Sequence, residues 1–334
     1  MKNLTFEEVK SLLNSPKRII IVTHYNPDGD AIGSSLGLNQ YLNLKGHISN
    51  VIVPNDYPDF LKWIYGASEI INFEINSQNA IQLINNSEII FTLDFNALHR
   101  AGKMKNLLEK NESLKIMIDH HEMPGSYAHY KYSDNEISST AEMIYNFIER
   151  MNDVKILNKS ICTALYTGMM TDTASFRFPK VTAKTHQIIS KFLEIGVNHS
   201  EIHDKVYSNI GMNKIKILGI ALKNLKLIQQ HSIAYTTLSQ KNLDENNFKK
   251  GDTEGLVNYG LSIDKVKMSV IFIENKFEGI IKISFRSRGK LDVNKFARKY
   301  FNGGGHKNAA GGKSEFTLDE CVKQFRKVVE DYIF

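Results

Sequence analysis

The sequence of 334 residues has little cysteine: only Cys162 and Cys321, which lie far apart in stretches with helical spacing of apolar residues. Two distant cysteines exclude a disulfide framework and a cysteine-rich metal cluster, so we expect buried thiols in a reducing compartment. No apolar run approaches the roughly 20 residues that a membrane-spanning helix needs. The N-terminus does not read as a signal peptide, because Thr5 and Glu8 have the spacing of a capping box that opens an amphipathic helix. We therefore expect a cytoplasmic protein without a membrane partner.

Positive charge is concentrated in one segment of the chain. The net charge is +6, but residues 276–313 contain ten Lys or Arg against two Asp or Glu, a local balance of +8 that leaves about −2 for the rest. Such a segment suggests a partner that bears phosphate groups. A solvated basic face would have the same composition.

The length predicts two domains, and the patterns change character near residue 200. In the first half, helical patterns alternate with apolar strand candidates at Arg18–Thr23, Ile48–Val53, Glu88–Leu93 and Lys115–Ile118. This alternation predicts an α/β fold with a parallel, doubly wound sheet. Residues 199–230 look helical, and strand patterns of antiparallel character follow at Ile233–Leu238, Lys267–Glu274 and Gly279–Arg286. Helical patterns at Asp292–Tyr300 and Leu318–Tyr332 then flank a glycine-rich stretch.

The first strand candidate leads directly into residues 24–30, His-Tyr-Asn-Pro-Asp-Gly-Asp. His24, Asp28 and Asp30 thus lie on the loop that leaves the carboxyl end of a strand, where open α/β sheets bind ligands. Imidazole and carboxylates without a thiolate favour Mn²⁺ or a similar divalent ion over structural zinc. A polar turn with Asp30 as a helix N-cap would explain the same residues.

Three further clusters of Asp and His follow in the first half. Asp94 ends one strand candidate, residues 119–121 (Asp-His-His) end the next, and Asp172 follows a helical pattern. The carboxyl ends of neighbouring parallel strands lie side by side, so these groups can converge with His24, Asp28 and Asp30. Concentrated carboxylates repel one another unless cations neutralise them. This number of ligands suits two metal ions better than one.

Taken together, these motifs resemble those of the DHH phosphoesterase superfamily. The resemblance is carried by His24-x-Asn26-Pro27-Asp28-x-Asp30, Asp94, Asp119-His120-His121 and Asp172, in this order. Gly303-Gly304-Gly305-His306 looks like the glycine-rich motif of the associated DHHA1 domain. The compact two-domain form is similar to the bacterial oligoribonuclease (nanoRNase) and 3′-phosphoadenosine-5′-phosphate (pAp) phosphatase group.

This resemblance implies a domain plan and a metal centre. The plan is a DHH catalytic domain at residues 1–198, a helical linker at 199–212, and a smaller α+β DHHA1 domain with a mixed sheet at 213–334. Two Mn²⁺ ions are implied, with Mg²⁺ or Co²⁺ as substitutes. The ligands would be His24, Asp28 and Asp94 for one ion, and Asp30, Asp94, His120 and Asp172 for the other. A hydroxide activated by both ions would attack phosphorus.

Asp94, as the bridging ligand, and His121 are the expected catalytic residues. His121 would contact the scissile phosphate or the leaving oxygen, or else support a neighbouring ligand. Asp119 would orient a neighbouring histidine. Arg100, six residues after Asp94, is a weaker candidate for holding the phosphate, because a surface or structural role is the simpler explanation for a single residue.

Substrate contacts are expected in the second domain. Glycines without Cβ atoms let backbone N–H groups approach an anion, so Gly303, Gly304, Gly305 and His306 are phosphate-binding candidates, although a glycine triplet can also be a flexible loop. Arg286 ends a strand candidate and suits bidentate phosphate contact, with a salt bridge to the neighbouring domain as the alternative.

The expected function is hydrolysis of short oligoribonucleotides to 5′-mononucleotides and dephosphorylation of pAp, with both ends of the ligand held in one cleft. The alternatives are a hydrolase of linear or cyclic di-AMP and a nucleotide-sensing module without turnover. The expected partners are short RNA or nucleotide substrates, and the oligomeric state is open, with a homodimer as one expectation.

Overall fold

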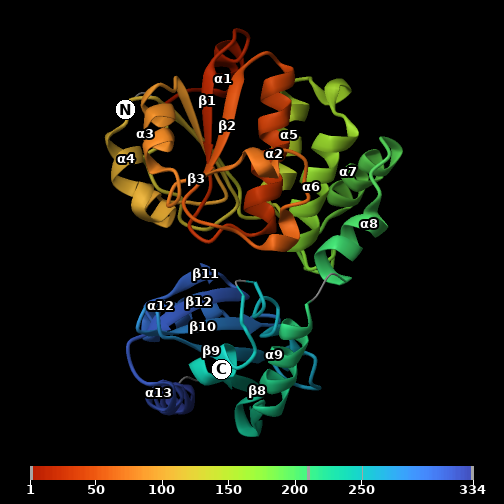
Figure 1. The fold of residues 1–334 in the computed structure, drawn as a ribbon. Helices are drawn as coiled ribbons and strands as arrows, with labels where there is room; N and C mark the ends of the chain where they lie inside the picture. The colour runs from red at the N-terminus through yellow and green to blue at the C-terminus, as the bar shows by residue number, and fades with distance from the viewer. Residues whose placement is uncertain (1–2, 209–210, 250, 332–334) are drawn as a thin grey trace. The chain divides into compact units, whose positions relative to one another are not determined.

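The computed structural model describes residues 3–208, 211–249 and 251–331. The chain divides into two compact units, residues 1–209 and 210–334. Each unit is built around a six-stranded sheet of its own (Figure 1).

The N-terminal unit contains the parallel, doubly wound sheet that the sequence predicts. All neighbouring strands pair in parallel, in the order β3-β2-β1-β4-β5-β6. The sequence patterns find four of these strands and miss β3 and β6, which are short edge strands without a continuous buried run. The bounds are β1 Arg18–Val22, β2 Ile48–Val53, β3 Ile71–Asn72, β4 Ile89–Leu93, β5 Leu114–Asp119 and β6 Tyr130–Ser133.

Helices cover both faces of this sheet, which explains why its central strands are apolar throughout. In β1, Ile19 and Ile21 belong to one buried cluster, together with residues of α2, α5, α6 and α7. Ile20 and Val22 belong to a second cluster, with residues of α3 and α4. The helices are α1 Phe6–Leu12, α2 Gly29–Leu44, α3 Ser77–Asn85, α4 Lys105–Lys110, α5 Thr140–Arg150, α6 Lys159–Asp172 and α7 Ala183–Glu194.

Glycine lets α2 and α6 pack with their backbones close together. A Cβ on Gly33 of α2 would lie 2.5 Å from the carbonyl oxygen of Ala164 in α6. A Cβ on Gly168 of α6 would lie 3.0 Å from Oδ1 of Asp30. This close contact joins the start of α2, which carries Asp30, to the end of α6, which carries Asp172.

The segment after α7 is helical on both sides of residues 209–210, which lie outside the described residues. It contains α8 His199–His203, a π-helical turn at Asp204–Ser208 and α9 Met212–Lys223. The linker predicted at 199–212 falls partly on residues 209–210, so its exact bounds stay a prediction.

The C-terminal unit is an α+β unit with a mixed sheet, as the family resemblance implies. Its strand order is β11-β12-β10-β9-β8-β7, and β8 pairs with β9 in parallel while the other pairs are antiparallel. One face packs on α12 and α13 through a cluster that includes Phe272, Phe285, Phe296 and Phe325. The strands are β7 Lys226–Ile228, β8 Ile233–Leu238, β9 Met268–Asn275, β10 Ile280–Ser287, β11 Gly304–His306 and β12 Ala309–Ser314. The helices are α10 Gln240–Asp244, α11 Asn258–Leu261, α12 Val293–Tyr300 and α13 Leu318–Asp331.

Two details of this unit differ from the sequence patterns. The glycine-rich stretch, for which no strand is predicted, forms the hairpin β11–β12 at the sheet edge. The helical pattern assigned to residues 199–230 is wrong at its end, where β7 pairs with β8. The strands β7 and β11 are short, and neither has an apolar run of its own. Each takes its extended conformation from pairing with a neighbouring strand. The predicted end of the last helix, Tyr332, lies outside the described residues.

Cys162 and Cys321 are free and buried, as the sequence predicts. The predicted capping box is present, with Thr5 Oγ1 accepting the Glu8 N–H and Glu8 accepting the Thr5 N–H. Within the described part of the chain, no helix combines the length and apolar character that crossing a bilayer requires.

Candidate active site

The acidic and imidazole groups of the N-terminal unit gather at the carboxyl edge of its sheet. His24 follows β1, Asp94 follows β4 and Asp119 ends β5. The strands β1 and β4 are neighbours, and the strand order reverses between them. This is the switch point at which open α/β sheets bind ligands.

Hydrogen bonds fix the loop after β1. Asn26 has a left-handed backbone with a φ of 58°. Its N–H donates to Asn55 Oδ1, and Asn55 Nδ2 donates to Asn26 Oδ1, both at 2.8 Å. Asp28 is the N-cap of α2, because its Oδ1 accepts the N–H groups of Asp30 and Ala31 at 3.1 Å each. The capping role considered for Asp30 therefore belongs to Asp28.

Asp30 is 1% exposed and is held by the N-terminus of α5. Its Oδ2 accepts the Thr140 N–H at 2.6 Å, and its Oδ1 accepts the Ala141 N–H at 2.8 Å. The N–H groups and the dipole at a helix N-terminus favour a carboxylate there. The orientation of Asp30 is thus set by a helix that begins 110 residues later in the chain.

Asp94 lies at the centre of the cluster. It is 2% exposed and has a left-handed backbone with a φ of 64°. Its Oδ2 lies 3.4 Å from His24 Nε2, and its Oδ1 lies 3.5 Å from His120 Nε2. The Thr140 hydroxyl donates to Oδ1 at 2.9 Å. Strained backbone of this kind persists where the surroundings fix it, often at functional sites. Each oxygen of Asp94 faces a different histidine.

The potential ligand atoms form two groups on either side of Asp94. Those of His24, Asp28 and Asp94 lie within 4.8 Å of one another, and so do those of Asp30, His120 and Asp172. His120 Nε2 is 3.9 Å from Asp30 Oδ2 and 3.5 Å from Asp172 Oδ2. The structure thus brings together all six residues that the family resemblance names as ligands.

Negative charge in this buried cluster needs neutralisation. Burial, followed by the proximity of Asp94 and Asp172, raises the pKa of Asp30 well above its ordinary value. Burial by itself lowers the pKa of His24, but its neighbouring carboxylates raise that pKa to about 10. Carboxylates this close hold protons unless cations replace them. Because the donors are nitrogen and oxygen without a thiolate, the residues present fit divalent metal ions.

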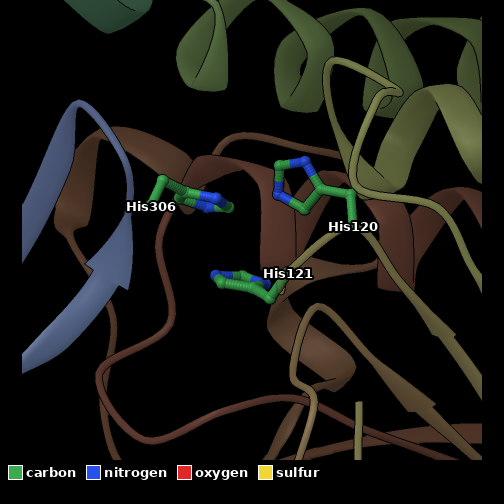
Figure 2. Close-up of side chains that lie close together, drawn as sticks. All are labelled: His120, His121 and His306. Atoms are coloured by element: carbon green, nitrogen blue, oxygen red, sulfur yellow. The ribbon is translucent and has the colours of Figure 1, made fainter. Parts of the chain in front are cut away.

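His121 is oriented by Asp119. Its Nδ1 lies 2.7 Å from Asp119 Oδ1, and its ring meets that of His120 edge to face, with centroids 5.0 Å apart (Figure 2). Burial raises the pKa of Asp119 to about 7. Burial and then the nearby Arg100 lower the pKa of His121 well below its ordinary value. The lowered pKa favours the neutral imidazole of His121, with Nδ1 facing Asp119 and Nε2 on the opposite side of the ring.

Arg100 belongs to the 3₁₀ helix η3, Leu98–Met104. Its carbonyl oxygen accepts the N–H of Tyr25, beside the first predicted ligand, at 2.6 Å. Its charge lies close enough to lower the pKa of both Asp119 and His121. The structure thus places Arg100 beside this pair, and a phosphate contact from there stays a prediction.

In the C-terminal unit, Arg286 and His306 project from the same face of the sheet. Arg286 of β10 is opposite Ala309 of β12, which is opposite His306 of β11. Directly opposed residues of antiparallel strands point to one face. Only the small Ala309 separates the guanidinium and the imidazole in this row.

The glycines at 303–305, just before and within β11, allow close backbone packing. A Cβ on Gly303 would overlap the carbonyl oxygen of Gly311. Gly305 has a φ of 145°, and a Cβ there would lie 2.5 Å from the carbonyl oxygen of Ala309. Gly304 has more room, with its nearest neighbour atom at 3.5 Å. Gly303 and Gly305 thus approach β12 closely, and a phosphate contact by the three glycines stays a prediction.

Two residues that shape the metal centre are not found from the sequence. Thr140 supplies an N–H to Asp30 and a hydroxyl to Asp94, and Asn55 holds the loop that contains Asn26. The helical pattern beginning at residue 139 signals a helix N-terminus. Nothing in the sequence links that terminus to a carboxylate more than a hundred residues earlier.

The chain matches two protein-family models. The model described as the DHH family, N-terminal domain, covers residues 18–169, and the DHHA1 domain covers residues 230–333. Five of the six predicted ligands lie in the first range, and Asp172 lies just beyond it. The glycine-rich hairpin lies in the second range.

Individual relatives match over nearly the whole chain. The bifunctional oligoribonuclease and PAP phosphatase NrnA of Bacillus subtilis is 27% identical over 91% of this chain and 91% of its own. The uncharacterized protein MG371 of Mycoplasma genitalium is 30% identical over 93% of this chain and 89% of its own. A solved structure, an exopolyphosphatase-related protein from Bacteroides fragilis, is 39% identical with a TM-score of 0.93, over 98% of this chain and 96% of that one.

Proposed function

The chain belongs to the DHH family, with a DHHA1 domain after the DHH domain, and on this premise we propose that it is a metal-dependent phosphoesterase. Its substrates would be short oligoribonucleotides, released as 5′-mononucleotides, and pAp. The observation that carries the proposal is the two neighbouring ligand groups, with Asp94 belonging to the first and facing His120 of the second at 3.5 Å. The name of the Bacillus subtilis relative, which spans 91% of this chain, supports the choice of substrates.

We assign one divalent ion to His24, Asp28 and Asp94, and a second to Asp30, Asp94, His120 and Asp172. Mn²⁺ suits these donors, and Mg²⁺ or Co²⁺ could replace it. When bound, such ions lower the pKa of water and neutralise the phosphoryl oxygens of a substrate.

The protein itself orients the metal-binding carboxylates through hydrogen bonds that do not require an ion. The N-terminus of α5 holds Asp30 through two backbone N–H groups, and the hydroxyl of Thr140 holds Asp94. Outer hydrogen bonds of this kind typically affect metal affinity or activity by about 10- to 100-fold. They leave the carboxylates little freedom to lose on binding metal.

His121 and Arg100 would act on the substrate rather than on the ions. The contact between Asp119 and Nδ1 of His121 directs Nε2 away from Asp119. We assign Nε2 to contact with the scissile phosphate or the leaving ribose oxygen. Arg100, on the same side of the sheet, would add positive charge beside that phosphate.

We assign a further phosphate of the substrate to Arg286, His306 and residues 303–305. Support comes from the common face of Arg286 and His306 and from the local balance of +8 over residues 276–313. A guanidinium presents two parallel N–H donors to a phosphate, which an ammonium cannot do. Arg286→Lys should therefore raise KM about tenfold and leave kcat nearly unchanged.

A substrate panel tests the proposal. The protein in Mn²⁺ is incubated with di- to pentaribonucleotides, pAp, linear and cyclic di-AMP, and pyrophosphate, and the rates are ranked. We expect the short ribonucleotides and pAp to be turned over fastest. If both are left untouched, the proposal is wrong. Faster hydrolysis of a di-AMP substrate would favour the alternative enzyme, and binding without any product would favour a sensing module.

A further inference from the structure

The sheet face that carries Arg286 changes character across the C-terminal unit. Over β8 and β9 it is buried: Leu238 and Ile271 join a cluster with residues of α9 and α10, beside the buried Thr236 and Ser269. Ser284 of β10 lies opposite Ile271, on the same face, but there the face becomes polar. Along β10, buried and partly exposed residues alternate, which places Lys282, Ser284 and Arg286 together on this face.

The strand register defines three successive rows on this polar part. Arg286 is opposite Ala309, Ser284 is opposite Gly311, and Lys282 is opposite Lys313. At about 3.3 Å per residue, the lysine row lies roughly 13 Å from the row of Arg286. The row between them holds Ser284, the exposed Gly311 and, on β11, Gly304. Two rows that carry positively charged side chains are thus separated by a row in which the side chains are small or absent.

The two lysines are accessible at the sheet surface. Lys313 is exposed. Lys282 Nζ lies 2.5 Å from Glu278 Oε1, and the two side chains are 43% and 46% exposed. An ion pair this open to solvent contributes little stability, so a phosphate can compete with Glu278 for the ammonium group.

A cavity of about 230 Å³ adjoins Lys313 at the end of β12. Its lining also includes Tyr300 at the end of α12, Gln324 of α13, Asn302, Glu315 and Phe316. Because α12 and α13 pack on the sheet face opposite Arg286, a ligand on the lysine row reaches this cavity past the end of β12. Phe316 is 55% exposed, so its ring is accessible to a stacking partner. Aromatic faces stack on nucleobases, and side-chain amides hydrogen-bond to base edges. The volume suits a single base rather than a whole nucleotide.

We propose that this end of the sheet is a second nucleotide subsite. An oligoribonucleotide with one phosphate at Arg286 would place a later phosphate between Lys282 and Lys313, and the adjoining base would reach past the end of β12 into the cavity beside Phe316. The inference rests on the proposed function, because it extends the same substrate site. A mononucleotide such as pAp is too short to span both rows. The subsite therefore selects substrates by length.

The test compares a tetraribonucleotide with pAp in Phe316→Ala and Lys313→Glu. Each change should raise KM for the tetranucleotide about tenfold, since stacking one base is worth about 1–3 kcal/mol, and should leave pAp hydrolysis unchanged. Phe277→Ala, at a side chain 96% exposed, and Lys216→Glu, at an exposed position of α9, are the matched controls and should change neither substrate.

A parallel binding measurement separates this inference from the proposed function. The anisotropy of a labelled tetraribonucleotide, recorded in EDTA, reports binding without turnover. About tenfold weaker binding by both variants, with the controls at the wild-type value, supports the subsite even if no substrate is hydrolysed. Unchanged tetranucleotide binding would overturn it. So would an equal rise in KM for the tetranucleotide and for pAp in the kinetic comparison.

Discussion

Replacing Asp94 by Asn removes one charge from the centre of the cluster with little change in shape. Burial alone would raise the pKa of Asp94, but His120 and His24 hold it well below its ordinary value, so it is an anion at neutral pH. Its two oxygens face His24 and His120 at 3.4 and 3.5 Å. If Asp94 bridges two ions, the substitution weakens both sites at once.

The size of the effect follows from what the ions contribute. Charge stabilisation by bound metal is worth several kcal/mol, and each 1.36 kcal/mol is a factor of ten in rate. If the substitution removes about 4 kcal/mol of transition-state stabilisation, kcat/KM should fall about a thousandfold. Mn²⁺ at 100 times its Kd stabilises a protein by about 2.7 kcal/mol, which raises Tm by roughly 5–10 °C in a domain of this size. The variant should lose most of that rise.

The assay combines pAp and dinucleotide turnover with thermal melts in EDTA and in Mn²⁺. Asp59→Asn, at a carboxylate with 74% side-chain exposure, controls for the loss of one negative charge and should behave as wild type. Asp94→Asn should melt near wild type in EDTA and differ from it only in Mn²⁺. A variant that kept a tenth of wild-type turnover together with the full Mn²⁺ stabilisation would refute the bridging role.

Three further predictions follow from single contacts. Asp119→Asn removes the carboxylate that orients His121, so kcat should fall about 10- to 100-fold; titration calorimetry should still find wild-type Mn²⁺ stoichiometry, and loss of an ion would contradict the assignment. Gly303→Ala places a Cβ against the carbonyl oxygen of Gly311 and should cost about 1–3 kcal/mol in urea unfolding; an unchanged unfolding free energy would mean that the hairpin can shift. Burial lowers the pKa of His47 from 6.5, and its Nδ1 accepts a backbone N–H at 3.1 Å. The folded protein therefore binds fewer protons than the unfolded chain, so its unfolding free energy falls as the pH drops through 6.5. His47→Asn keeps an acceptor that does not titrate and should lose less stability between pH 7.5 and 5.5; an equal loss would contradict this.

The central sheet was predictable because its strands are buried on both faces. The run of residues 19–22 is apolar whichever face each side chain points to, so the strand is visible without knowledge of its neighbours. The edge strands β3, β6, β7 and β11 lack such runs. Their conformation depends on a ladder with a distant strand, which local patterns do not encode.

The positions of the site residues were predictable where they follow strands. Parallel strands end at the same edge, so His24, Asp94 and His120 could be expected to meet. The contacts that orient the donors come from elsewhere in the chain. Two backbone N–H groups of α5 hold Asp30, and these have no side-chain signature in the sequence. The assignment of the cap to Asp28 rather than Asp30 likewise depended on the actual start of α2.

Anomalous diffraction from a crystal of the protein grown in Mn²⁺ tests the metal centre most directly. The account predicts two manganese peaks, with Asp94 contacting both. His24 and Asp28 should complete the contacts of one peak, and Asp30, His120 and Asp172 those of the other. A single peak, or two peaks without a shared carboxylate, would contradict it.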